Sequence, residues 1–513
     1  MSLAMNRPQY EKHLGNIYTP DWVANLMLSG LYAEHKLNAK VADLGCGDGA
    51  FMAAIVRYIA REAEAQGKTI RWVKNVLQTK VFGFDVSHEA IAAAKLRLDL
   101  VALECGLSNV NWQLHCQDVT SVAFRDAWAD SFDACIGNPP YVRVQNLGQS
   151  VRDNLKLLPT TSGATDLYLA FIYISHHIVK PRGNVCVITP SSYLGSQSAK
   201  AFRTWLAESA CITEVWDFRN KQVFPDATTY TCVTNLKKAA KATKFAYKVW
   251  DDAAECFALQ REVTSVAWAN GPFALTSTDA AHEVEADMAK LPALKDVATI
   301  NYGLATLADA YYMGIVLKET DTTVTLKTRA GTIEVEKAAT KKIIKASTHQ
   351  GKDKGKAFRI VFPYERIGQK HVLLKEVRFR QQWPLAYAYL ESIKEVLLAR
   401  DKGTHPADKW YAFGRTQGLD TTFGPKILTS PINKEPGFFV AEDPDTCYIS
   451  GYGIKANCDL HALCAQLNSD RMVKFIAAVS RDYREGWRAY HKTFIKDFPV
   501  DWDALERLSH KAA

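Results

Sequence analysis

The chain has 513 residues, of which 48% are hydrophobic and 23% are charged, a composition that is typical of a folded protein and excludes a largely disordered one. Because this length exceeds that of a single hydrophobic core, we expect two domains, or three. The formal charge of +8 allows a polyanionic partner without requiring one, and the lack of a long apolar run or a signal-like start argues against membrane insertion and secretion.

The 11 cysteines are scattered through apolar stretches and include no pair at zinc-ligand spacing. Cys46 and Cys135 fall within the ends of expected strands. We therefore expect reduced core thiols in a cytoplasmic protein, and we predict no metal site.

The first expected helix follows Tyr18, Thr19 and Pro20. Thr19 suits the N-cap, with Pro20 at the first helical position. The apolar side chains of this helix recur at helical spacing and are expected in the core, so Thr19 and Pro20 are the functional candidates. The apolar positions are Trp22, Val23, Leu26, Met27 and Leu31.

A strand from Val41 runs into a glycine-rich turn, followed by a helix expected from Ala50 to about Ala65. Gly45 and Gly47 let the backbone approach a ligand closely, and the helix start offers unpaired N–H groups. Dinucleotide and phosphate sites share this pattern, but the spacing here is not G-x-G-x-x-G and no G-K-[ST] follows. Asp43, just before the glycines, suits a cationic ligand better than a pyrophosphate.

Two further expected strands also end at acidic residues. The strand at 80–86 ends near Asp85, after a helix and loop at 61–79, and the strand at 110–115 leads to Asp118. A carboxylate that follows a glycine-rich turn by one strand commonly bonds a ribose diol, although the gap to Asp85 is longer than usual. Together with Asp43, these carboxylates are predicted to line one rim of a sheet.

The apolar stretch at 132–137 stops at Asn138-Pro139-Pro140-Tyr141. This pattern predicts a buried strand that ends in a rigid loop, since proline fixes its own φ and cannot donate to a sheet. The Asn138 side chain and the Pro139 carbonyl are acceptors, and Tyr141 adds an aromatic face. Such a set suits a planar heterocycle with an amino group. The alternative is a turn with a capping Asn and a packed Tyr.

A helix at 166–178 and strands at 185–190, 212–218 and 229–236 complete the expected sheet. Strands that alternate with helices predict a mostly parallel sheet covered on both faces, an α/β fold. We place the domain boundary in the basic stretch after Leu236, giving domains 1–238 and 239–513. The second is expected to be mixed α+β with a helical C-terminal part. Its lysine-rich middle is either a solvated face or a set of phosphate contacts, and comprises Lys337, Lys341, Lys342, Lys345, Lys352, Lys354 and Lys356.

The order of these motifs resembles the gamma-class adenine-N6 DNA methyltransferases, the TaqI-like enzymes and the methylase parts of Eco-type combined restriction enzymes. The resemblance rests on 18–20, 43–47, 138–141, 166–171 and 223–225. It implies a Rossmann-like domain that uses S-adenosyl-L-methionine, followed by a target-recognition domain that binds double-stranded DNA. A monomer is expected, and a cognate restriction enzyme would be a separate protein because little chain precedes Tyr18.

The resemblance also implies roles for individual residues. Thr19, with Tyr18 and Pro20, and Gly45, with Gly47, would shape the methionine end of the cofactor. Asp43 would lie near its ammonium or sulfonium group, Asp85 near the ribose and Asp118 near the adenine amine. Tyr141 and Phe224 would sandwich a flipped-out adenine, whose N6 amine Asn138 and Pro139 would hold, with Pro140 keeping the loop rigid.

Two alternatives remain open. Glutamine methyltransferases of release factors and some RNA methyltransferases carry the same tetrapeptide, so the substrate could be RNA or a protein glutamine. A cofactor-binding subunit of a larger assembly is the second alternative, although an intact tetrapeptide is not needed for a purely structural role. Residues 239–513 leave room for a DNA-reading domain, which favours DNA.

Overall fold

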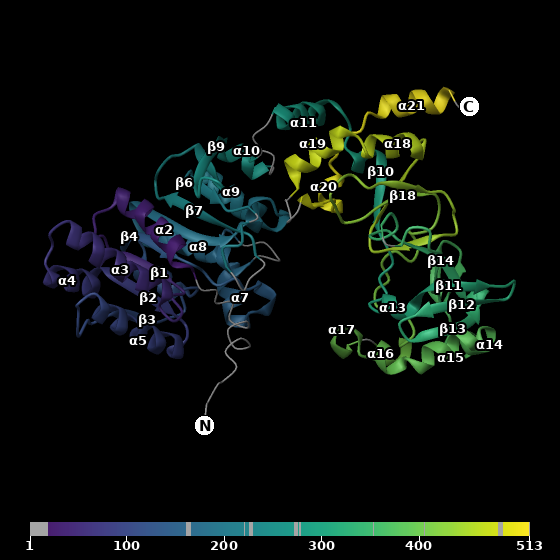
Figure 1. Ribbon diagram of the computed structural model, residues 1–513, viewed down its shortest axis with the longest axis horizontal. Helices are drawn as coiled ribbons and strands as arrows, with labels where there is room; N and C mark the ends of the chain where they lie inside the picture. Colours follow the sequence, from purple (N-terminus) through teal and green to yellow (C-terminus); the bar gives the residue numbers. More distant parts are fainter. Residues whose placement is uncertain are drawn as a thin grey trace. The chain divides into compact units, whose positions relative to one another are not determined.

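The computed structural model describes residues 19–160, 166–219, 221–224, 229–270, 275, 279–351, 353–404, 406–480 and 486–511. Tyr18, one of the expected cofactor residues, lies outside these ranges. The chain divides into two compact units, Met1–Ser277 (unit 1) and Thr278–Ala513 (unit 2), each with its own sheets and helices (Figure 1). In the described residues, no helix is both long and apolar enough to cross a membrane.

Unit 1 is built on a nine-stranded sheet in the order β3-β2-β1-β4-β5-β7-β6-β8-β9. The strands from β3 to β5 are all parallel, and β7 runs antiparallel to both of its neighbours. The predicted α/β fold with a mostly parallel sheet is confirmed. The strands are β1 (Val41–Leu44), β2 (Val81–Asp85), β3 (Gln113–Cys116), β4 (Phe132–Gly137), β5 (Val179–Pro190), β6 (Ile212–Asp217), β7 (Thr231–Lys237), β8 (Lys244–Asp251) and β9 (Cys256–Thr264).

Successive side chains of a strand point to opposite faces of the sheet, so the apolar strands of this sheet present apolar side chains on both faces. Helices cover both faces and bury these side chains. In β4, for example, Cys135 packs into one core cluster while Ala134 and Ile136 pack into the other. One face is covered by α2 (Asp21–Glu34), α3 (Ala50–Ala65), α4 (Ile70–Lys80) and α5 (His88–Glu104). The other is covered by α6 (Val122–Trp128), α7 (Gln149–Lys156), α8 (Leu167–Ile178), α9 (Lys200–Glu208) and α10 (Ser265–Asn270).

Two local expectations differ from the structure. Helix α2 begins at Asp21 with Pro20 as its N-cap, so the cap lies one residue after Thr19 and uses no side-chain hydrogen bond. The segment 61–79 is not one extended helix and loop, because α3 ends at Ala65 and a separate helix α4 starts at Ile70. Thr69 caps α4 by accepting a hydrogen bond from Trp72 N at 3.2 Å.

The boundary expected after Lys238 also differs from the structure, which divides the chain after Ser277. Strands β8 and β9 extend the same sheet beyond β6, so β7 does not close it. Lys238 is not part of a solvated linker. Its ammonium group donates to the carbonyl oxygens of His177 and Val179, each at 2.9 Å, and pairs with Asp130 at 2.7 Å.

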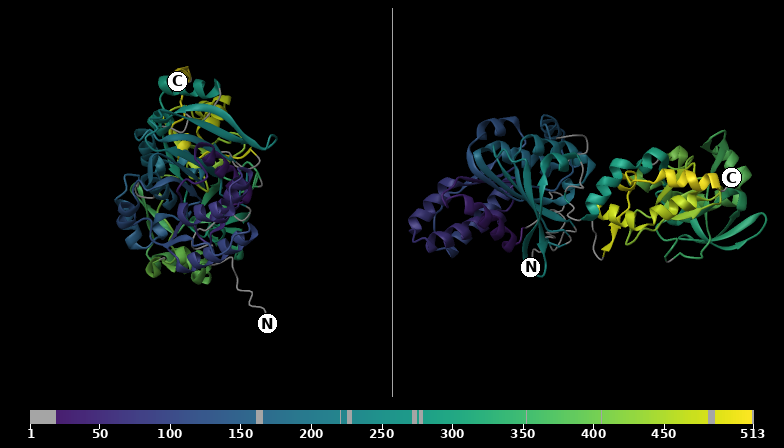
Figure 2. Two further views of the ribbon diagram at one scale, coloured as in Figure 1. Left: turned by 90° about the vertical axis from the view of Figure 1, so that its left-hand side faces the viewer. Right: turned by 90° about the horizontal axis from the view of Figure 1, so that it is seen from above.

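Unit 2 contains a six-stranded sheet, a four-stranded sheet and two small ribbons, with helices packed beside them (Figure 2). The six-stranded sheet has β11 (Met313–Glu319), β12 (Thr323–Thr328), β13 (Gly331–Glu336), β14 (Thr340–Lys345), β15 (Phe358–Val361) and β21 (Cys447–Ile449). The four-stranded sheet has β10 (Ala298–Tyr302), β18 (Lys426–Thr429), β20 (Phe439–Ala441) and β22 (Tyr452–Ala456). The ribbons pair β16 (Tyr364–Ile367) with β17 (Lys370–Leu373), and β19 (Ile432–Asn433) with β23 (Arg488–Ala489).

The helices of unit 2 follow the expected mixed α+β pattern. They are α11 (Asp279–Lys290), α12 (Leu294–Val297), α13 (Asp309–Tyr312), α14 (Glu376–Gln382), α15 (Pro384–Ser392), α16 (Lys394–Leu398), α17 (Arg400–Gly403), α18 (Leu460–Leu467), α19 (Asp470–Val479), α20 (Lys492–Ile495) and α21 (Trp502–Lys511). Arg400 cross-links three segments of this unit, because its buried guanidinium donates hydrogen bonds to backbone carbonyls of each. The acceptors are Leu397, Thr306, Trp410 and Ala412.

Candidate functional site

The candidate site lies where β1 and β4 are neighbours in the sheet of unit 1. Strand order runs from β1 to β3 on one side of this point and from β4 to β5 on the other. In an open α/β sheet, such a reversal leaves a crevice outside the carboxyl ends of the strands, where ligands bind. The glycine-rich loop follows β1 here and the Asn138–Tyr141 loop follows β4.

The glycine loop is held in a left-handed conformation that glycine adopts without strain. Gly45, Gly47 and Gly49 have φ values of 74°, 54° and 78°. Asp85 anchors this loop, since its Oδ2 accepts a hydrogen bond from Gly47 N at 3.0 Å and its Oδ1 accepts from Ser87 N at 2.9 Å. The Asp85 side chain therefore shapes the loop, and the remaining lone pairs on its two oxygens can still accept from a ligand.

Asp118 follows β3, the neighbour of β2, so the three predicted carboxylates belong to three adjacent parallel strands. Its Oδ1 accepts from Thr120 N at 2.9 Å and from Thr120 Oγ1 at 2.6 Å. These bonds to a turn two residues on fix the side chain in place. Asp43, Asp85 and Asp118 thus lie on or directly after adjacent strands, but Asp43 is buried within β1.

Asp43 is the most unusual of the three carboxylates. It is 1% exposed, and no donor among the described residues lies within hydrogen-bonding distance of either oxygen. Burial and the nearby Asp85 carboxylate raise the pKa of Asp43 to about 8. Its carboxylate lies against Gly137, the last residue of β4, because a Cβ added there would be 2.2 Å from Asp43 Oδ1. The strands β1 and β4, which lead into the two loops, are therefore in close contact through this pair.

The Asn138–Tyr141 loop touches the glycine loop directly. A Cβ added at Gly45 would meet Pro140 Cδ at 3.2 Å and Phe171 Cε1 at 3.3 Å. Pro139 is buried, Asn138 is half-buried and its Oδ1 is shielded from solvent. Tyr141 is fixed by a hydrogen bond from its hydroxyl to the Ile188 carbonyl oxygen at 3.2 Å. The structure thus brings the Asn138–Tyr141 loop beside Gly45 through Pro140.

Phe224 is placed beside Tyr141, but the two rings do not form an open sandwich. Their centroids are 6.4 Å apart at an interplanar angle of 69°, an edge-to-face contact, and Phe224 is 1% exposed. Two rings that hold a base between them are parallel to it. One of the two rings must therefore turn before a base can be held between them.

The sequence did not predict the close approach of Gly137 to Asp43, nor the burial of Asp43 without a donor. A glycine at the end of a buried strand indicates a close approach of other atoms, and that signal was available in the sequence. The partner of this close approach was not, because Asp43 is distant in the chain and meets Gly137 only through the β1–β4 pairing. Thr19 is buried, and Pro20 is the N-cap of α2.

The fold of the whole chain is similar to that of a solved structure, the Type IIL restriction-modification enzyme MmeI in complex with DNA. The likeness has a TM-score of 0.61 at 12% identity and covers 93% of this chain and 65% of MmeI. The strand order and the two loops at its reversal define unit 1 as a Rossmann-like α/β domain.

Residues 79–224 match the Eco57I restriction-modification methylase family. The Type II methyltransferase M.BanIII of Aneurinibacillus aneurinilyticus is 26% identical over 87% of this chain and 78% of its own length. The Type II restriction enzyme and methyltransferase RM.Eco57I of Escherichia coli is 22% identical over 75% of this chain and 45% of its own length. Residues 79–224, which lie within unit 1, are thus similar to the methylases of restriction-modification systems.

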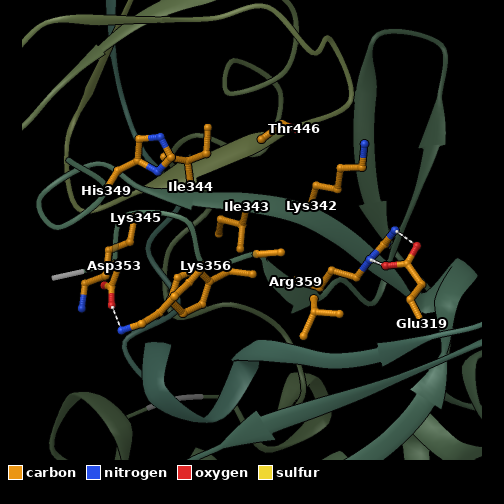
Figure 3. Close-up of a pocket in the computed structure, with 13 residues that line it drawn as sticks. Glu319, Lys342, Ile343, Ile344, Lys345, His349, Asp353, Lys356, Arg359 and Thr446 are labelled. Atoms are coloured by element: carbon orange, nitrogen blue, oxygen red, sulfur yellow. Dashed lines mark hydrogen bonds and ion pairs between the residues drawn. The ribbon is translucent and has the colours of Figure 1, made fainter. Parts of the chain in front are cut away.

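The described residues also form clefts outside this site. One, in unit 1, has a volume of about 640 Å³ and is lined by Trp22, Trp216, Trp250 and Phe257. Another, in unit 2, has a volume of about 230 Å³ and includes part of the lysine-rich middle (Figure 3). Ion pairs neutralise much of its charge, namely Arg359 with Glu319, Lys356 with Asp353 and Lys342 with Asp443. Lys352 of the lysine-rich middle lies outside the described residues.

Proposed function

We propose that the protein is a site-specific DNA methyltransferase that transfers a methyl group from S-adenosyl-L-methionine to the N6 amine of a flipped-out adenine in double-stranded DNA. The observation that carries this proposal is the contact between the glycine loop and the Asn138–Tyr141 loop through Gly45 and Pro140. This contact places the glycine loop, which is suited to bind a cofactor, next to the loop that carries two hydrogen-bond acceptors for an amine, Asn138 and Pro139. The restriction-modification relatives support DNA as the substrate.

The residues at the β1–β4 junction fit a cationic cofactor. Asp43 is a buried carboxylate with no described donor, and a positively charged ligand would provide its missing partner. Gly45 and Gly47 would let the cofactor approach the backbone, and Asp85 and Asp118 would accept from its hydroxyl and amino groups. When bound, S-adenosyl-L-methionine supplies an electrophilic methyl carbon on a positively charged sulfur.

The role of the protein in the reaction is mainly positioning. Asn138 Oδ1 and the Pro139 carbonyl oxygen accept hydrogen bonds from the two N6–H groups of adenine. These bonds draw the nitrogen lone pair out of conjugation and aim it at the methyl carbon. Pro139 and Pro140 keep this loop rigid, which matters because a displacement of about 1 Å can cost a factor of about 100 in rate. The cost of flipping the base, a few kcal/mol, is partly recovered by stacking on Tyr141 and Phe224.

The test is methyl incorporation from labelled S-adenosyl-L-methionine into unmethylated genomic DNA, followed by digestion to nucleosides. We expect N6-methyladenine with the intact protein. Asn138→Ala should reduce incorporation at least about 100-fold without abolishing cofactor binding, because it removes an acceptor used only for the amine. Asn146→Ala is the matched control, since Asn146 is exposed and lies shortly after the loop.

Three outcomes would contradict the proposal. Near-normal turnover of Asn138→Ala would remove the catalytic assignment. Label in RNA or in a protein glutamine, with none in DNA, would favour the alternative substrates. No activity of the purified chain on any of the three, with cofactor binding intact, would favour a cofactor-binding subunit.

A further inference from the structure

The ionisation of Asp43 is the feature from which a further inference can be drawn. Its side chain lies between β1 and β4, against the α-carbon of Gly137, and is fully buried. The titratable groups that face it are Asp85 from β2, Cys46 from the glycine loop and Cys135 from β4. All of them are neutral or negative, so no described cation compensates a charge on Asp43.

An isolated carboxylate in such surroundings is costly to ionise, because it loses its hydration and gains no hydrogen bond. The group avoids this cost by holding a proton, which agrees with the rise of its pKa to about 8. At pH 7, a group with this pKa is protonated in about nine molecules out of ten. Burial without a donor thus favours the neutral form of Asp43 in the free protein.

We propose that Asp43 carries a proton in the free protein and releases it when a positively charged cofactor binds, so that this carboxylate selects for cationic ligands. The O–H bond of the carboxylic acid breaks, its electron pair stays on the carboxylate oxygen and the proton passes to the solvent. The positive charge of the ligand then replaces the proton as the partner of the carboxylate. This inference rests on the proposed function, because it takes S-adenosyl-L-methionine as the ligand.

Proton release can be counted by isothermal titration calorimetry of S-adenosyl-L-methionine into the full chain at pH 7, in buffers of different ionisation enthalpy. Wild type should release about 0.9 proton more than Asp43→Asn, which keeps the shape of the side chain but cannot ionise. Asp48→Asn should behave as wild type, because Asp48 is an exposed acid of the same loop paired with Arg97.

The affinity provides a second measurement. Binding that requires an ionised Asp43 should tighten about tenfold from pH 6 to pH 7 in wild type, beyond any change in Asp43→Asn. If Asp43→Asn does not fold or bind, infrared spectra of the free wild-type protein across pH 6–9 decide the question. The carbonyl band of a buried, protonated carboxylic acid should then disappear as the pH rises through about 8.

Results that refute the role of Asp43 differ from results that refute the proposed cofactor. Equal proton counts in wild type and Asp43→Asn, with clear binding in both, would overturn the role of Asp43 and leave the cofactor assignment standing. A wild-type affinity that does not change between pH 6 and pH 7, or a carboxylic acid band absent at pH 6, would also overturn it. No binding heat in wild type under any condition would overturn the proposed cofactor and this inference together.

Discussion

Gly137→Ala is the substitution that most directly tests the contact between β4 and the Asp43 side chain of β1. A Cβ at this position would lie 2.2 Å from Asp43 Oδ1 and 3.2 Å from Asp43 Cγ, whereas real Cβ contacts essentially never fall below 3.0 Å. The Asp43 carboxylate or one of the two strands must therefore move by about 1 Å. Gly137 does not have a positive φ, so its backbone accepts alanine and the cost is purely steric.

The loss of unfolding free energy in Gly137→Ala depends on how far the surrounding strands can shift to relieve the clash. Asp43 is buried in β1, and β1 and β4 are each paired on both sides within the sheet. Overpacking of this kind costs about 1–3 kcal/mol of unfolding free energy. A cost of about 2 kcal/mol should lower the melting temperature by about 4–8 °C in a unit of this size. Because Asn138 is the next residue, a shift of about 1 Å should also slow methyl transfer about 100-fold.

Two assays measure these effects: thermal unfolding followed by circular dichroism, and methyl incorporation into DNA at saturating cofactor. Gly148→Ala is the matched control, because nothing lies within 4 Å of a Cβ added there and its φ of −62° suits alanine. That variant should stay within about 0.5 kcal/mol of wild type. If Gly137→Ala kept both the melting temperature and the rate of wild type, the close contact between Asp43 and Gly137 would be refuted.

Two further predictions concern unit 2. Arg400→Lys should destabilise it by about 2–3 kcal/mol in urea unfolding, since one ammonium group cannot donate to all the carbonyls that Arg400 binds. The control Arg366→Lys, at an exposed position, should have little effect. Equal urea midpoints for the two variants would contradict this prediction. Burial lowers the pKa of Lys426 to about 8, so between about pH 8 and 10.5 the unfolded chain holds a proton that the folded chain has lost. The stability of wild type relative to Lys426→Met should therefore rise with pH over this range, and a constant difference would show that Lys426 does not titrate there.

The sequence by itself determined the parts of the fold whose signals are local. The apolar run at 41–44 followed by glycines, and the run at 132–137 followed by two prolines, each gave a strand and the loop at its end. Helix α3 was expected from Ala50 to about Ala65 and has those bounds. The loops of the candidate site could be found for the same reason, since glycine and proline restrict the backbone wherever they occur.

The tertiary structure alone decided which of these segments meet. The boundary was expected after Lys238 because a basic stretch is typical of a linker, but hydrogen bonds from Lys238 to carbonyls distant in the chain hold that stretch in the folded unit. The edge-to-face rings of Tyr141 and Phe224, the approach of Gly137 to Asp43 and the burial that raises the pKa of Asp43 also depend on the tertiary structure. They depend on distances between strands that are far apart in sequence, and a local pattern of residues carries no information about such distances.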